Sequence, residues 1–147
     1  MPTVEQVRNK VLRMMAQSFQ VKLNDDGDVI VRYESATCLV TVVDWQSNNE
    51  GRNTLVHVRI PILWNVSLTP ELYKWVATEG QNYMIGTVRV KMVEGKTEGN
   101  LWFVQYLLGD NLDVNELENT VKFMLGDSNR LDDELQKKFG GKRTTDL

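Results

Sequence analysis

The spacing of apolar residues changes several times along the chain, and each change marks a new structural element. Over residues 4–19 the apolar side chains recur at intervals of three and four, with charged residues between them, which predicts an amphipathic helix. Thr3 and Gln6 have the spacing of a capping box, in which each side chain binds a backbone N–H at the helix start. A first helix is therefore expected directly after Thr3.

The apolar spacing becomes two after the first helix, which is typical of β-strands. Residues 21–23 and 29–33 alternate in this way on either side of the polar run 24–28. That run contains Gly27, which tolerates the positive φ of a hairpin turn. The pattern predicts a hairpin of two short strands.

Two longer β segments follow the hairpin. We predict strands from Ala36 to Trp45 and from Thr54 to Trp64, separated by a polar loop over residues 46–53. Pro61 lies inside the second segment and has no backbone N–H to donate to a neighbouring strand. This strand is therefore expected at an edge of the sheet, or bent at Pro61.

The next segment predicts a helix and two more strands. Residues 69–71, Thr-Pro-Glu, combine a preferred N-cap, a proline suited to the first helical turn and an acidic residue at the positive end of the helix dipole. After a stop near Gly80, strands are expected from Ile85 to Val93 and from Asn100 to Leu108. The last strand is apolar on both faces, which indicates cover on both sides or one face offered to a partner.

A long helix ends the predicted fold. Asp113 is suited to cap it, a heptad-like apolar spacing runs to Phe139, and two glycines then stop it. The element order predicts one α+β domain over residues 1–141, with helix–strands–helix–two strands–helix order on an antiparallel sheet. Residues 142–147 form a polar tail that we expect to be frayed.

Length, charge and cysteine content narrow the class of protein. A chain of 147 residues has the size of a single domain, and a net charge of −3 gives no general attraction for nucleic acid. No apolar run reaches the roughly 20 residues that a membrane-spanning helix needs, and the charges within residues 1–19 argue against a secretion signal. Cys38 is the only cysteine, so we expect no disulfide within the chain and a cytoplasmic location.

The sequence offers little chemistry for catalysis, cofactors or metals. His57 is the only histidine, so a catalytic pair of Cys38 and His57 is the one candidate, against the alternative that Cys38 is a packed core thiol. Phosphate-binding glycine motifs are absent and a zinc site would need more ligands. The acidic turn 24–28 suggests calcium, but it lacks the ligand spacing of an EF-hand loop and fits a solvated turn better. We predict no enzyme activity, no cofactor and no metal.

Aromatic and methionine residues are more numerous than one small core obviously needs. The chain has four tryptophans and six methionines, and these residue types are frequent at interfaces and in adaptable apolar grooves. A basic cluster near the end of the last helix has two interpretations, interaction with the helix dipole or contact with an anion or acidic peptide. The cluster consists of Lys137, Lys138, Lys142 and Arg143.

The arrangement resembles the YbjN-like family, which shares the fold of class I type III secretion chaperones. The resemblance covers nearly the whole chain through its element order. It is strongest in the last third, where Leu107-Leu108 precedes Asn111-Leu112-Asp113, and Asp132-x-Glu134-Leu135 runs into Phe139-Gly140-Gly141. This ending is similar to that of the actinobacterial members. The resemblance implies a peptide-binding chaperone or adaptor, usually dimeric, that holds an unfolded stretch of a client protein.

We therefore predict a cytoplasmic, dimeric, non-enzymatic protein that shields an extended client segment by strand addition and apolar pockets. The predicted peptide contacts are Trp64 and Trp102, with Met14 and Phe19 nearby. Two alternatives remain open. One is a regulatory or structural dimerisation module without a client peptide, and the other is a small hydrolase that uses Cys38 or His57.

Overall fold

The predicted α+β class and element order are confirmed by the structure. The computed structural model describes residues 2–47 and 51–147. The helices are α1 (Val4–Ser18), α2 (Pro70–Ala77) and α3 (Val114–Phe139), with short 3₁₀ turns η1 (Glu79–Gln81) and η2 (Thr144–Asp146). The strands are β1 (Val21–Leu23), β2 (Val29–Tyr33), β3 (Ala36–Ser47), β4 (Gly51–Ser67), β5 (Thr87–Met92) and β6 (Glu98–Leu108).

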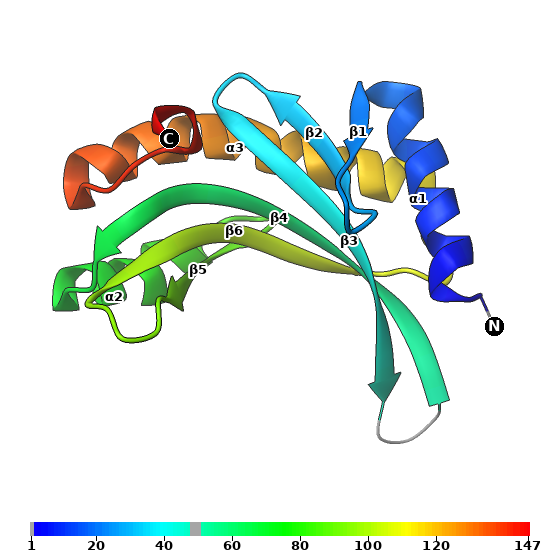
Figure 1. Cartoon of the computed structure of the whole chain (residues 1–147), viewed down its shortest axis with the longest axis horizontal. Coiled ribbons are helices and arrows are strands. Elements are labelled where there is room, and N and C mark those ends of the chain that lie inside the picture. The colour runs from blue at the N-terminus through cyan, green and yellow to red at the C-terminus, as the bar shows by residue number, and fades with distance from the viewer. Residues whose placement is uncertain (1, 48–50) are drawn as a thin grey trace.

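The six strands form one antiparallel sheet in the order β1-β2-β3-β4-β6-β5. Figure 1 shows the sheet strongly curved, with the three helices on the same side of it. On that side α1 and α3 pack against each other and against the central strands, and α2 packs against β5. The sheet therefore has one covered face and one face that none of these helices covers, which we call the open face.

Alternation along the strands sorts side chains between the two faces. Cys38 and Val40 of β3, Val58 and Ile60 of β4 and Phe103 of β6 are almost completely buried and belong to the core under the helices. Their neighbours in sequence point to the open face instead. The strand predicted to be apolar on both faces, β6, thus has one face in the core and one face that none of the described helices covers.

The helix starts follow the predicted capping signals. In α1 the Thr3 hydroxyl accepts from the Gln6 N–H at 3.1 Å, and the Gln6 side chain accepts from the Thr3 N–H at 2.9 Å. Thr69 caps α2 and Asp113 caps α3 through equivalent hydrogen bonds. These caps satisfy backbone donors that have no partner inside the helix.

The structure corrects the predicted bounds of β4 and decides between the two alternatives for its position. The polar segment 46–53 is not a loop throughout, because β3 continues to Ser47 and β4 begins at Gly51; residues 48–50 lie outside the described residues. Of the two alternatives for β4, the edge position is wrong, since the strand pairs with β3 and with β6, whereas an irregularity at Pro61 is present. Pairing with β3 ends at Arg59, and the register against β6 shifts just after Pro61, so the missing N–H falls where the ladder is already interrupted.

The expectation that residues 142–147 are frayed is also wrong. Lys142 exchanges two backbone hydrogen bonds with Trp64, at 2.7 and 2.8 Å, on a stretch of β4 that β3 no longer pairs with. The Arg143 side chain then binds Asp133 at 2.6 Å and Asp146 at 3.1 Å. Unpaired strand groups on β4 and acidic side chains nearby therefore hold this segment in place.

Candidate functional site

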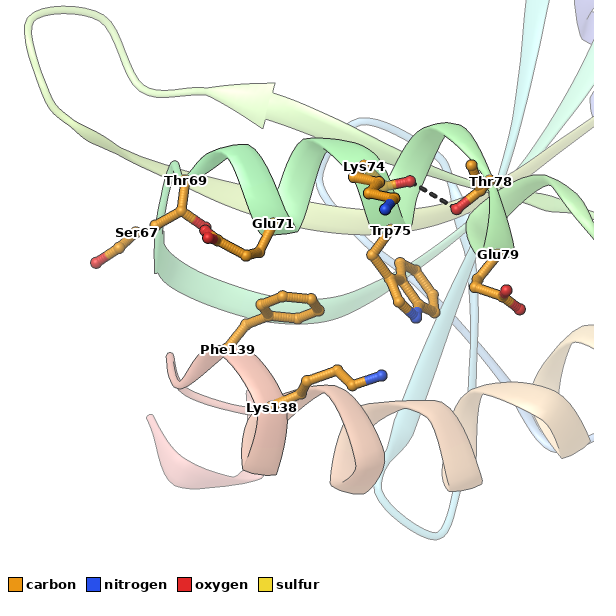
Figure 2. A pocket seen from close by; sticks show the side chains of 9 residues that line it. All are labelled: Ser67, Thr69, Glu71, Lys74, Trp75, Thr78, Glu79, Lys138 and Phe139. Atoms are coloured by element: carbon orange, nitrogen blue, oxygen red, sulfur yellow. Dashed lines mark hydrogen bonds between the residues drawn. The ribbon is translucent and has the colours of Figure 1, made fainter.

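A groove of about 650 Å³ lies between α2 and the end of α3 (Figure 2). Its floor is aromatic, because Trp75 of α2 and Phe139 of α3 meet there edge to face with ring centroids 6.3 Å apart. Both residues are half-buried and pack against the core on their inner sides. The groove thus presents a fixed apolar surface that is open to solvent.

Local sequence explains how Trp75 is placed. Buried Gly80 lies under the indole, and a Cβ at that position would come within 3.3 Å of both the Trp75 ring and Val88. A glycine here therefore lets the turn after α2 approach the indole closely. The cap on Thr69 fixes the other end of α2, so the ring has a defined position above β5.

Charged side chains of both signs surround this floor. Lys74, Glu71 and Glu79 come from α2 and its following turn, and Lys138 comes from the last turn of α3. Figure 2 shows the four side chains around the aromatic rings. In the described part of the chain none of them forms an ion pair, so their hydrogen-bonding capacity is available to a ligand.

The open face of the sheet is the second candidate surface. Trp45, Tyr106 and Leu108 are each more than 40% exposed there. Monomeric proteins rarely expose continuous apolar patches without a function, so this face is a candidate for binding. Its apolar members are Ile30, Leu39, Val43, Trp45, Leu55, Trp102, Val104, Tyr106 and Leu108.

Aromatic and basic side chains pack against each other on this face. His57 stacks on Tyr106 with ring centroids 4.1 Å apart and an interplanar angle of 12°. The Arg89 guanidinium lies 5.7 Å from the Tyr106 ring, and the Arg59 guanidinium lies 5.7 Å from the Trp102 ring. These contacts hold the cationic groups against rings that attract them electrostatically.

The structure brings together two of the four predicted contact residues. Trp64 and Trp102 meet at 5.6 Å between ring centroids, and the Trp64 indole N–H donates to the Thr144 hydroxyl at 3.0 Å. Met14 lies in α1 and Phe19 directly follows it, and both pack partly buried against the core under the helices. Since Trp102 points to the open face, the four residues do not form one patch.

Sequence reasoning missed the groove. Trp75 falls within the helix predicted after residues 69–71, and Phe139 ends the last predicted helix, but nothing in the sequence pattern shows that the two residues meet. One clue was present, namely the interpretation of Lys138 as a possible contact for an anion or acidic peptide. Lys138 does line the groove, whereas Arg143 of the same basic cluster is bound to Asp133 and Asp146.

The candidate catalytic pair is excluded by geometry. Cys38 is fully buried on the covered face, and burial raises the pKa of its thiol to about 12. His57 points to the open face, where burial and the nearby Arg59 and Arg89 lower its pKa to about 4. The two side chains therefore lie on opposite sides of the sheet, and the interpretation of Cys38 as a core thiol agrees with its position.

The acidic turn 24–28 is organised by its own hydrogen bonds. The Asn24 side-chain oxygen accepts from the N–H groups of Asp26 and Asp28, at 3.0 and 2.9 Å. Gly27 has the expected positive φ of 81°. Within the described ranges, no three acidic, histidine or cysteine side chains gather as they would around a metal ion.

The fold combines a one-sided helical layer with exposed apolar surfaces. The sheet is backed by helices on one face and carries two exposed surfaces on which a partner could bind, the apolar open face and the aromatic groove. Among residues 2–47 and 51–147, every helix is too short or too polar to cross a bilayer. No curated protein matches the sequence.

The family is shown by a sequence match. The model of the TY-Chap1 family, described as "T3SS (YopN, CesT) and YbjN peptide-binding chaperone 1", matches residues 3–147. The chain belongs to this family of peptide-binding chaperones. The match confirms the predicted resemblance to YbjN-like proteins, and it includes the segment 142–147 that pairs with β4.

Proposed function

We propose that this protein binds an extended segment of a client protein and anchors one apolar side chain of that segment in the groove between α2 and α3. The observation that carries the proposal is the pair of Trp75 and Phe139, which form an aromatic floor open to solvent. Membership of a peptide-binding chaperone family supports the same function.

The chemistry of the groove favours a peptide over a small polar ligand. Burying one Leu-sized or Phe-sized side chain on the aromatic floor contributes about 1.5–3 kcal/mol. Ser67 and Thr69 can bond peptide backbone groups at one end of the groove. Lys138 and Glu79 are available for side chains of either charge at the other end.

Further contacts of the client segment remain part of the proposal. We propose that Trp64 and Trp102 provide a second aromatic contact, and that Met14 and Phe19 provide one beside α1. We also propose that the protein acts in the cytoplasm as a homodimer, without catalysing a reaction on its client. The open face exposes apolar side chains, among them Trp45, Tyr106 and Leu108, that a client or a second copy could cover.

The role of the groove in binding is tested by substituting a large side chain at an exposed residue that lines it. Peptides of about 12 residues are selected from a random display library on the full chain, and their affinities are measured by fluorescence anisotropy. Thr78→Trp places a bulky ring in the groove, so we expect affinity to fall at least about tenfold, or roughly 1.4 kcal/mol.

Ala77→Trp provides a matched control. Ala77 is the exposed neighbour of Thr78 and does not line the groove, so the same ring at this position should leave affinity within about twofold. Equal weakening by both variants, or selection of no peptide at all, would contradict the proposed site.

The open face also favours a second candidate function. A regulatory or structural dimerisation module would use that apolar face to bind a second copy and would need no client. Sedimentation at micromolar concentration, combined with a dye that reports exposed apolar surface, separates the two functions. A dimer that leaves no dye-binding patch and selects no peptide would establish the dimerisation module.

A further inference from the structure

A second, smaller hollow lies on the open face of the sheet, away from the groove. It has a volume of about 260 Å³ and is formed by β4, β5 and β6. Its polar lining consists of His57, Arg59, Arg89 and Lys91, and its apolar lining includes Trp102 and Val104. The groove between α2 and α3 lies on the helix-covered side, so the two sites are separate.

The charge at this hollow is strongly one-sided. Three cationic side chains, Arg59, Arg89 and Lys91, line it in a protein whose net charge is −3. Asp28 lies 3.9 Å from the Arg59 guanidinium and offsets part of this charge. A local cationic cluster in an acidic protein is a feature of anion recognition, since the field of nearby like charges favours a bound negative group.

Unused hydrogen-bonding groups point to the same conclusion. The His57 Nε2, the Arg59 Nε and the Trp102 Nε1 atoms are shielded from solvent, yet have no hydrogen-bond partner among the described residues. Buried polar atoms without a partner carry a free-energy cost, and they are uncommon away from functional sites. An acceptor that enters beside them would relieve this cost at the arginine and tryptophan N–H groups.

The cationic groups are also held in position before a ligand arrives. The Trp102 and Tyr106 rings pack against the guanidinium groups of Arg59 and Arg89, and Thr41 accepts a hydrogen bond from Arg59 at 3.2 Å. A guanidinium whose orientation is already fixed loses less conformational entropy when it binds a carboxylate.

We propose that this hollow binds a carboxylate of the client, so that the segments this protein holds are acidic as well as apolar. The proposal rests on the proposed peptide-binding function and adds the chemistry of the partner. Aliphatic side chains around the hollow, among them Leu39, Leu55 and Leu108, fit the alternate residues of an extended peptide. A phosphate backbone would leave them exposed.

The single histidine makes the hollow directly observable. His57 is the only histidine in the chain, so its ring signals in an NMR spectrum need no assignment by mutation. The groups that face it are Thr41 on β3, Arg59 on β4, Tyr106 on β6 and Arg89 on β5. The two arginines contribute to its low pKa of about 4, so an anion bound between them should raise that pKa.

The test uses two synthetic peptides of about 12 residues in which Leu and Phe alternate with Glu or with Gln. With the full chain, the Glu peptide is expected to bind at least about tenfold more tightly than the Gln peptide. It should also raise the pKa of His57 by about one unit, while the Gln peptide leaves it unchanged. The double variant Arg89→Gln/Lys91→Gln should reduce the preference for Glu to less than about threefold.

Lys96→Gln is the matched control for loss of one charge. Lys96 is an exposed residue of the turn between β5 and β6 and does not line the hollow, so this variant should keep the preference for Glu. Because the histidine titration uses the unaltered chain, it tests the proposal even if the double variant folds poorly.

Two results would overturn the proposal: equal binding of the Glu and Gln peptides, or a thymidine oligonucleotide of about 12 nucleotides that displaces the Glu peptide and binds more tightly. The proposed function can survive such a failure. Peptides selected by display that are weakened by Thr78→Trp, but not by the double variant, would support the groove and reject the carboxylate site.

Discussion

The two faces of the sheet are built from the same strands but differ in chemistry. On the covered face, strand residues such as Val58, Ile60 and Phe103 are fully buried and mostly aliphatic. On the open face, the neighbouring residues His57, Arg59 and Trp102 are half-buried and combine rings with charges. Residues that fill a core need only volume and shape, whereas the open face keeps groups whose bonding capacity is unused.

This difference separates stability from binding. The covered face loses packing if any side chain is shortened, because its neighbours close the space on all sides. The open face contacts solvent on one side, so its side chains can be changed with smaller losses. We therefore expect substitutions on the two faces of one strand to affect different properties, and β6 supplies the most direct comparison.

Phe103 and Tyr106 make that comparison within one strand. Phe103→Ala should lower the free energy of unfolding by about 3–5 kcal/mol, because Phe103 is fully buried and contacts Tyr83 in the core. Tyr106→Ala removes a ring that is 41% exposed and should cost less than about 1.5 kcal/mol. Urea unfolding followed by circular dichroism measures both. Similar losses for the two variants would show that the open face is part of the core.

Polar contacts on the covered side should have the next largest effect. Ser35 donates to the Asp132 carboxylate at 2.7 Å, and Asp132 is only 4% exposed. Ser35→Ala leaves this carboxylate without that donor and should cost about 1–3 kcal/mol near neutral pH. Ser35→Thr keeps a hydroxyl and should cost less.

The pH dependence of this variant has a definite sign. Burial raises the pKa of Asp132, and the hydrogen bond from Ser35 opposes that rise. Without Ser35 the carboxyl group should take up a proton more readily in the folded protein. The loss of stability in Ser35→Ala should therefore shrink as pH falls through the folded pKa, as urea unfolding over a pH series would show. A loss that stays constant with pH would mean that the hydroxyl does not act through the carboxylate.

Most of the fold could be predicted because it follows from local rules. The bounds of α3, Val114–Phe139, were predicted from its N-cap Asp113, its apolar spacing and the glycines after it. The segment 46–53 was missed because its polar composition resembles a loop, while pairing between β3 and β4 extends the ladder to Ser47 and Gly51. Strand length here is set by the partner strand and not by composition.

The candidate sites were harder to predict than the fold. Trp75 and Phe139 are far apart in sequence, and nothing in their spacing shows that α2 and the end of α3 lie side by side. The hollow on the open face likewise needs three strands in register, with Arg59 and Arg89 brought to opposite sides of Trp102 by β6. A sequence indicates which residues face outward, but the sheet order decides which of them meet.

The pH dependence of stability tests the electrostatic environment of His57 on the open face, and this test needs no ligand. Its folded pKa of about 4 lies below its ordinary value of 6.5, so the unfolded chain binds the proton more readily between these values. The contribution of neutral His57 to the free energy of unfolding should be fully present above about pH 6.5 and should fall as pH drops toward 4. Because the group is half exposed, solvent screening reduces the loss to roughly 1–2 kcal/mol.

A non-titrating ring isolates this effect. His57→Phe can keep a stacked ring on Tyr106 but cannot take up a proton. Urea unfolding at about pH 7.5 and about pH 5 should show a smaller pH-dependent loss in the variant than in the unaltered chain. An unchanged pH dependence would mean that His57 is as well solvated as in the unfolded chain, and the open face would then lack the electrostatic character inferred for it.

The smallest effect on stability is expected at the side-chain contact between β4 and the C-terminal segment 142–147. The Trp64 indole donates to the Thr144 hydroxyl, and Trp64 also touches Trp102. Thr144→Val removes the acceptor at nearly constant volume and should cost about 0.5–1 kcal/mol. Thr145→Val, at the exposed neighbouring position, should cost nothing measurable. If the Trp64–Thr144 hydrogen bond contributed nothing, both variants would match the unaltered chain in urea unfolding.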